Sequence, residues 1–193
     1  MKTLLKKEND MKHAKLITFA LAAVLVLTQW NGIAHAESAA GIDADADAAL
    51  VKLYEAQPVA KMLSEKAAAV LIFPNIVKAG FLVGGQYGQG ALRKKGKTVG
   101  YYSSAAGSFG LQAGAQSFGY VLFLMKDSAV KHLNSSKGWE IGIGPSIVIV
   151  DEGIAKNLST TTLRSDVYAF IFSQEGLMAG AGLQGAKITR IKK

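Results

Sequence analysis

The chain has 193 residues, of which 50% are apolar and 19% are charged, a balance typical of one globular domain. It contains no cysteine, which excludes disulfides, thiolate nucleophiles and the usual zinc-ribbon and iron–sulfur sites. Its formal net charge of +8 favours an anionic partner, and the place of that charge along the chain decides which class of partner is meant.

Residues 1–36 have the pattern of a secretory signal peptide. Lysines precede an apolar run over 16–27, and the small residues Ala34 and Ala36 follow it at the spacing of a cleavage site. The run is shorter than the roughly 20 residues that a membrane-spanning helix needs. We therefore predict synthesis from Met1 or Met11, cleavage after Ala36, and an exported protein that is periplasmic or secreted and peripheral to the membrane. Nucleic acid is then not an expected partner.

The mature chain, 37–193, is predicted to form a single domain that offers little for enzyme chemistry. Its one imidazole is His132, so it cannot supply a cluster of histidine ligands. A hydrolase built on Asp151, Glu152 or Asp166 would lack a paired-carboxylate motif. We predict a protein that is not an enzyme and uses no cofactor and no metal. The mature chain keeps a net charge of +5, because five basic and two acidic residues leave with the signal peptide.

Residues 42–66 have the apolar spacing of helices. Pro58 fits the first turn of a helix but not a helix interior, so two short helices are expected to meet near Gln57. Three aspartates resemble the opening of a calcium-binding loop: Asp43, Asp45 and Asp47. Ala48 stands where such a loop requires glycine, so we favour carboxylates at a helix N-terminus over a calcium site.

From residue 67 onward, β-branched and aromatic runs alternate with Gly, Ser and Asn, which predicts strands separated by turns. The runs are 69–73, 81–87, 98–105, 120–125, 141–150 and 167–173. Turn signals stand at Lys95-Gly96, Lys137-Gly138, Glu152-Gly153 and Glu175-Gly176. One helix is expected from Asp127. The predicted fold class is α+β, with N-terminal helices over 42–66 and a largely antiparallel sheet over 67–193 that is covered on both faces or curls towards a barrel.

A glycine-flanked pattern occurs three times, over 80–85, 110–115 and 176–181. Positions i and i+4 of a strand face the same side, so each copy presents a stripe without side chains. We favour close backbone packing as its purpose, and the approach of a ligand is the alternative. Residues 85–90 are not a nucleotide-binding loop, because no Gly-Lys-Ser/Thr sequence and no βαβ unit follow them.

Four cations within five positions form the densest charge cluster of the mature chain, at the tip of a predicted hairpin: Arg93, Lys94, Lys95 and Lys97. Near an acidic membrane each would contribute about 1 kcal/mol of attraction. We predict that this cluster binds anionic lipid headgroups, with Lys78 and Arg190 as further candidates. The alternative is a hairpin whose charges only keep the sheet soluble. The C-terminal cations join the cluster only if the fold brings them near it: Lys187, Arg190, Lys192 and Lys193.

Glycine and aromatic motifs follow one another through the mature chain: Phe73-Pro74, Lys78-Ala79-Gly80-Phe81, Gly84-Gly85, Gly88-x-Gly90, Gln112-x-Gly114, Gly144-Pro145 and Gly176-Leu177. In this order and spacing they resemble the SYLF domain family, also called the Ysc-type actin-binding or lipid-binding domain, over about 50–191. The resemblance implies binding of acidic phospholipids, phosphoinositides in particular, and actin binding by several eukaryotic members. It implies no enzymatic activity.

The mature chain opens with acidic residues where those eukaryotic members place a basic or amphipathic segment, so we do not expect actin binding: Glu37, Asp43, Asp45 and Asp47. An exported bacterial member would meet phosphatidylglycerol, cardiolipin or lipopolysaccharide as its acidic surface. The alternative function is a structural or protein-interaction module of the cell envelope. In that case the sheet edges or the glycine stripes dock another protein, without specific lipid binding.

Overall fold

The computed structural model describes residues 37–81, 83–109, 114–135, 138–159, 161–176, 183 and 185–193. The predicted signal peptide, 1–36, lies outside the described residues, as do the turn residue Lys137 and most of the second and third glycine patterns. None of the helices in the described ranges combines the length and the apolar content that crossing a bilayer requires.

Two helices begin the described chain and meet at Gln57, as predicted. Helix α2 spans Ala39–Ala56, and the Ser38 hydroxyl caps it by accepting a hydrogen bond from the Gly41 amide at 3.0 Å. Helix α3 spans Pro58–Lys66, with Pro58 in its first turn. Helix α2 buries one stripe at a helical spacing, formed by Ile42, Ala46, Ala49 and Leu53.

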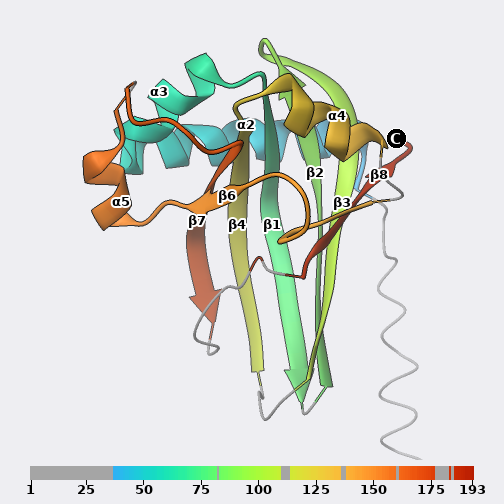
Figure 1. Ribbon diagram of the computed structural model, residues 1–193. Coiled ribbons are helices and arrows are strands. Elements are labelled where there is room, and N and C mark those ends of the chain that lie inside the picture. Colours follow the sequence, from blue (N-terminus) through green and yellow to red (C-terminus); the bar gives the residue numbers. More distant parts are fainter. Residues whose placement is uncertain are drawn as a thin grey trace, which may run out of the picture. The chain divides into compact units, whose positions relative to one another are not determined.

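An eight-stranded sheet follows, in the order β5-β8-β3-β2-β1-β4-β7-β6. Its strands are β1 (Ala69–Phe81), β2 (Val83–Lys94), β3 (Lys97–Phe109), β4 (Gly114–Leu124), β5 (Trp139–Glu140), β6 (Ile147–Ile149), β7 (Val167–Gly176) and β8 (Lys187–Ile191). Every neighbouring pair is antiparallel except β6 and β7. The sheet curls but stays open, because β5 and β6 form its two edges (Figure 1). The predicted α+β class is confirmed.

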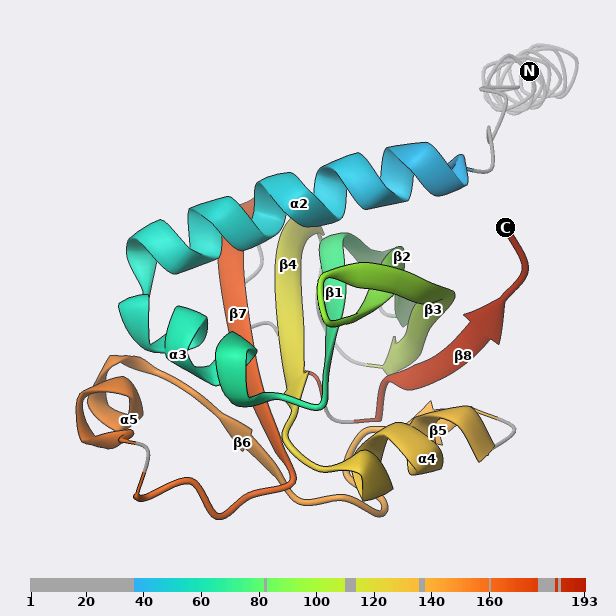
Figure 2. The ribbon, with the colours of Figure 1, turned by 90° about the horizontal axis from the view of Figure 1, so that it is seen from above.

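Each face of the sheet carries its own core. On one face, α2 and α3 pack against Val70, Ile72, Val121 and Phe123, with the short helix α5 (Glu152–Asn157) beside them. On the other, concave face, helix α4 (Asp127–Ser135) and Trp139 cover Leu71, Phe73, Tyr102 and Tyr120. Figure 2 shows α2 and α4 on opposite sides of the sheet. Both faces of the C-terminal part of β4, residues 118–124, are therefore buried beneath the helices, as the apolar sequence over 120–125 predicts.

Bulges bend the central strands where they leave the helices. The pairing of β1 with both β2 and β4 shifts register between Ile72 and Ile76, around Pro74, which has no amide hydrogen to donate to the ladder. Beyond this point β1, β2, β3 and β4 continue as a long extension that the helices do not cover (Figure 1). We call this part the lower sheet. It consists of residues 76–81 of β1, 83–88 of β2, 104–109 of β3 and 114–118 of β4.

Three predictions for the C-terminal half were wrong. Glu175-Gly176, predicted as a turn, is the end of β7, where Glu175 pairs with Ser117 and Gly176 with Gln116. The strand predicted over 141–150 is reduced to β6, because Gly142 and Gly144 take positive φ values of 108° and 97° that turn the chain before Pro145. The turn predicted at Glu152-Gly153 is instead the start of α5, since the Asp151 carboxylate accepts a hydrogen bond from the Ile154 amide at 2.8 Å and caps the helix.

Candidate functional site

The predicted hairpin carries its cations at the turn between β2 and β3. Lys95 and Gly96 form a two-residue turn with φ values of 51° and 76°, the left-handed pair that suits the twist of a hairpin. Lys94 and Lys97 pair in register on either side of it. All three lysines are exposed. Only Lys94 has an ionic partner among the described residues, the exposed carboxylate of Asp127 at 3.4 Å, and such a surface pair stabilises little.

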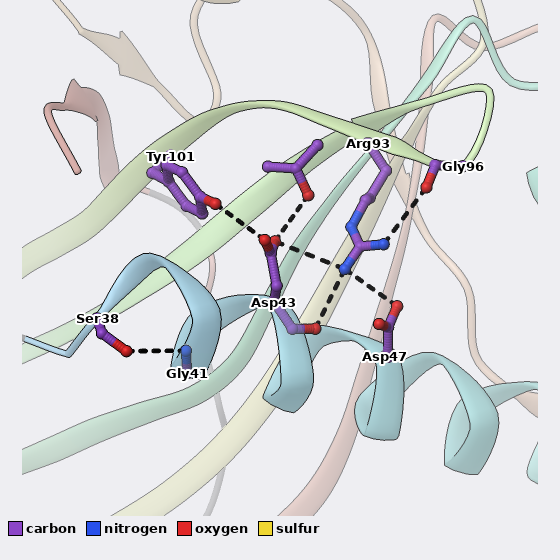
Figure 3. Close-up of polar contacts among 8 residues, drawn as sticks. Ser38, Gly41, Asp43, Asp47, Arg93, Gly96 and Tyr101 are labelled. Atoms are coloured by element: carbon purple, nitrogen blue, oxygen red, sulfur yellow. Dashed lines mark hydrogen bonds and ion pairs between the residues drawn. The ribbon is translucent and has the colours of Figure 1, made fainter.

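The Arg93 side chain points towards α2 rather than into solvent (Figure 3). Its Nη2 lies 3.0 Å from the Asp47 carboxylate and 3.6 Å from that of Asp43, and donates to the Asp43 carbonyl at 3.1 Å. Its Nη1 donates to the Gly96 carbonyl at 3.4 Å. The side chain is only 15% exposed. Arg93 therefore joins the hairpin to α2, and its charge is already balanced within the protein.

Asp43 is the centre of this junction. Besides Arg93, its carboxylate accepts hydrogen bonds from Thr98 Oγ1 at 2.7 Å and from the Tyr101 hydroxyl at 2.9 Å (Figure 3). A bulge in β3 makes this possible, because Val99 is an extra residue opposite Arg93 and the shift turns Thr98 to the α2 face. Burial, followed by the contact with the Asp43 carboxylate, raises the pKa of the Tyr101 phenol.

The structure changes the interpretation of the N-terminal aspartates. Helix α2 begins at Ala39, so Asp43 and Asp47 lie beyond its first turn, and the predicted role at the helix N-terminus is wrong. Their spacing of four places both carboxylates on one face of the helix, where they hold Arg93. That spacing was the signal available in the sequence, but nothing in the sequence identifies the partner.

The C-terminal cations reach the hairpin because β8 pairs with β3. Ile191 lies opposite Tyr101, and Arg190 Nη2 donates to the Val99 carbonyl at 3.3 Å, two residues from Lys97. Lys193 Nζ donates to the Glu37 carbonyl at 2.6 Å. A shallow hollow of about 640 Å³ beside β3 is lined by Gly100, Tyr101, Arg190, Ile191, Lys192 and Lys193. Three of the four C-terminal cations thus lie at the hairpin end of the sheet, whereas Lys187 lies farther down, opposite Ala105.

Lys78 is not part of this group. It lies in the lower sheet, opposite Gln86 of β2 and Gln116 of β4, on the concave face. The structure therefore separates the six predicted residues into three sets. Lys94, Lys95, Lys97 and Arg190 lie together and exposed, Arg93 is bound to α2, and Lys78 is remote.

The carboxylates considered for a hydrolase serve the loops. Asp151 caps α5, and Glu152 is the first residue of that helix. Asp166 accepts hydrogen bonds from the Ser146 amide and hydroxyl at 3.0 and 2.9 Å, and lies 2.8 Å from Lys126 Nζ. Lys126 and then Ser146 lower its pKa to about 2. Asp166 therefore ties together the chain segments that precede β6 and β7.

Comparison with known families supports the resemblance seen in the sequence. The family model Ysc84, described as Las17-binding protein actin regulator, matches residues 105–193. These residues include the second half of β3, β4, α4, β7 and β8, and they contain Arg190 and Lys193 but not the β2–β3 turn. A search of curated proteins gave no significant match. The match supports, for residues 105–193, the resemblance to the SYLF (Ysc84) domain family, a family of lipid- and actin-binding domains.

Proposed function

We propose that this protein is an exported, non-enzymatic module that binds surfaces rich in acidic phospholipids. The binding surface is formed by six cations, which we call the cationic end: Lys94, Lys95, Lys97, Arg190, Lys192 and Lys193. The observation that carries the proposal is the pairing of β3 with β8, which brings two cationic segments about ninety residues apart in the sequence to one end of the sheet.

The exposure of these side chains fits recruitment to a charged surface. Each basic residue near an acidic bilayer contributes about 1 kcal/mol, and Arg190 can bind a phosphate through two N–H groups. Because the charges lie in solvent, the attraction is screened over about 8 Å at physiological ionic strength. Binding should therefore weaken strongly as salt is added. Arg93 serves this surface indirectly, by fixing the hairpin to α2 through Asp43 and Asp47.

Vesicle co-sedimentation tests the proposal. The triple variant Lys94→Ser, Lys95→Ser, Lys97→Ser should lose most binding to phosphatidylglycerol vesicles at low salt, because half of the cationic end is removed. The charge-matched control removes three exposed lysines elsewhere, with Lys52→Ser, Lys61→Ser and Lys156→Ser, and should bind like the wild type. Equal loss in both variants would mean that net charge alone acts. Unchanged binding by the hairpin variant would place the site elsewhere.

A second candidate function is docking of another protein on the lower sheet. Its face on the α2 side exposes Val77, Val83 and Tyr87, with Val77 and Tyr87 directly opposite each other. Exposed apolar side chains grouped in this way are typical of interaction surfaces. If acidic and neutral vesicles fail equally to bind the protein, this alternative is favoured, and Tyr87→Ser should then weaken cross-linking to its envelope partner.

A further inference from the structure

The concave face of the lower sheet holds a row of polar side chains. Gln86, Lys78 and Gln116 come from β2, β1 and β4 and lie directly opposite one another in the antiparallel registers. Residues opposite each other in such a sheet share a face and have their Cβ atoms roughly 5 Å apart. The row therefore places the Lys78 side chain between those of two glutamines.

The two glutamines are buried to an unusual degree. Gln86 is 8% exposed and Gln116 is 4% exposed, whereas glutamine is mostly an exposed residue. Gln86 Nε2 and Gln116 Oε1 have no hydrogen-bond partner within the described residues. A buried carboxamide atom left without a partner costs about 1–3 kcal/mol of folding stability. Retention of two such groups in one row needs a compensating role.

Lys78 adds a charge that nothing described nearby neutralises. It takes part in none of the ion pairs within the described part of the chain. The next row of the same face consists of Gly84, Gly80 and Gly114, which belong to the repeated glycine patterns. The face beside Lys78 thus has no side chains, and Lys78 itself is half-buried. On this side the row is therefore bordered by backbone alone.

We propose that Lys78, Gln86 and Gln116 form a binding site for a phosphate group that carries a neighbouring hydroxyl. The ammonium and the Gln86 amide donate to phosphate oxygens, and Gln116 Oε1 accepts from the hydroxyl. The site is separate from the cationic end and does not depend on the proposed surface binding. Its ligand chemistry is shared by soluble glycerol phosphate and by the headgroup of a glycerophospholipid.

Opposite effects on stability and on binding test this site. Glycerol phosphate, at ionic strength matched with sodium chloride, should raise the Tm of the purified protein. Gln116→Leu should leave the Tm without ligand equal to or above that of the wild type, because an unpartnered carboxamide is removed from a buried position, but should abolish the rise with glycerol phosphate. A fall in that unliganded Tm would show that Gln116 is structural and would overturn the proposal.

Lys78→Met supplies the second measurement. Loss of a charge-assisted hydrogen bond should weaken glycerol phosphate binding about ten- to a hundredfold in a calorimetric titration. The control Lys61→Met, at an exposed position of α3, should bind like the wild type. Wild-type affinity in Lys78→Met, or no binding by the wild type itself, contradicts the site.

Vesicles distinguish the two sources of the phosphate group. If the ligand is a lipid headgroup, Lys78→Met should also weaken binding to phosphatidylglycerol vesicles while the cationic end is intact. If it is a soluble phosphate ester, the same variant should bind vesicles like the wild type and lose only glycerol phosphate. Both results are consistent with a phosphate site at Lys78 and differ only in the source of the phosphate. Loss of vesicle binding by the hairpin triple variant tests the cationic end and not this site.

Discussion

Arg93 belongs to the cationic cluster that the sequence predicts to bind lipid, but its contacts with Asp43 and Asp47 are those of a structural residue. We expect Arg93→Met to lower the free energy of unfolding by about 2 kcal/mol, because the carboxylates of Asp43 and Asp47 lose their cation and the hairpin loses its tie to α2. Urea unfolding measures this change. The folded variant should still sediment with acidic vesicles.

The opposite pattern would contradict this assignment. If Arg93→Met unfolds like the wild type but loses vesicle binding as fully as the variant with three lysines replaced, Arg93 contacts the lipid directly.

The lowered pKa of Asp166 predicts how the stability of the protein depends on pH. Its pKa in the folded protein is about 2, below the ordinary 3.8, because Lys126 and Ser146 favour the charged form. Its contribution to stability is therefore fully present above pH 3.8 and is lost as the pH falls towards 2. We expect Asp166→Asn to lower the Tm at neutral pH, with a difference from the wild type that shrinks over this range. A constant difference at every pH would mean that the charge of Asp166 is not what stabilises the loops.

At the scale of the element, Gly90 in β2 is closely packed, whereas Gly107 in β3, far from the β2–β3 turn, is not. A Cβ atom on Gly90 would lie 2.1 Å from the Ile72 carbonyl oxygen and 2.8 Å from the Phe73 ring, whereas one on Gly107 meets nothing within 4 Å. We expect Gly90→Ala to destabilise the protein by roughly 2–3 kcal/mol, since strand backbone must move. Gly107→Ala should change stability by less than about 0.5 kcal/mol. Thermal unfolding of the matched pair tests this, and equal effects would refute close packing as the reason for Gly90.

The elements themselves were predictable to the extent that their signals are local. Pro58 identified the boundary between α2 and α3, and Lys95-Gly96 identified the turn between β2 and β3. The bulge at Val99 was not predictable, because it depends on pairing with β2, and it decides that Thr98 and Tyr101 both reach Asp43. The apolar run 141–150 was misread because its β-branched residues outweighed Gly142, Gly144 and Pro145, which turn the chain.

At the scale of the whole molecule, the sheet order could not be derived from the sequence, and the candidate sites depend on it. The pairing of β3 with β8 joins Arg190 to the lysines of the turn. The pairing of β1 with β2 and β4 sets Lys78 between two glutamines that the sequence analysis did not single out. The sequence around Gln86 and Gln116 does not indicate a site, because the row combines residues from three separate strands. The vesicle and glycerol phosphate experiments test these two consequences of the topology separately.

The contacts of β3 also bear on when the chain can fold. Asp43 near the start of α2 binds Thr98 and Tyr101, and Ile191 in β8 pairs with the same Tyr101. Such widely separated contacts form late, because the entropy of closing long loops must be overcome first. A partly synthesised chain that lacks β8 would leave one side of β3 without its hydrogen-bonding neighbour. If the protein is exported, as we propose, such slow completion would leave the newly made chain unfolded for longer, and a chain passes through a translocation channel in the unfolded state.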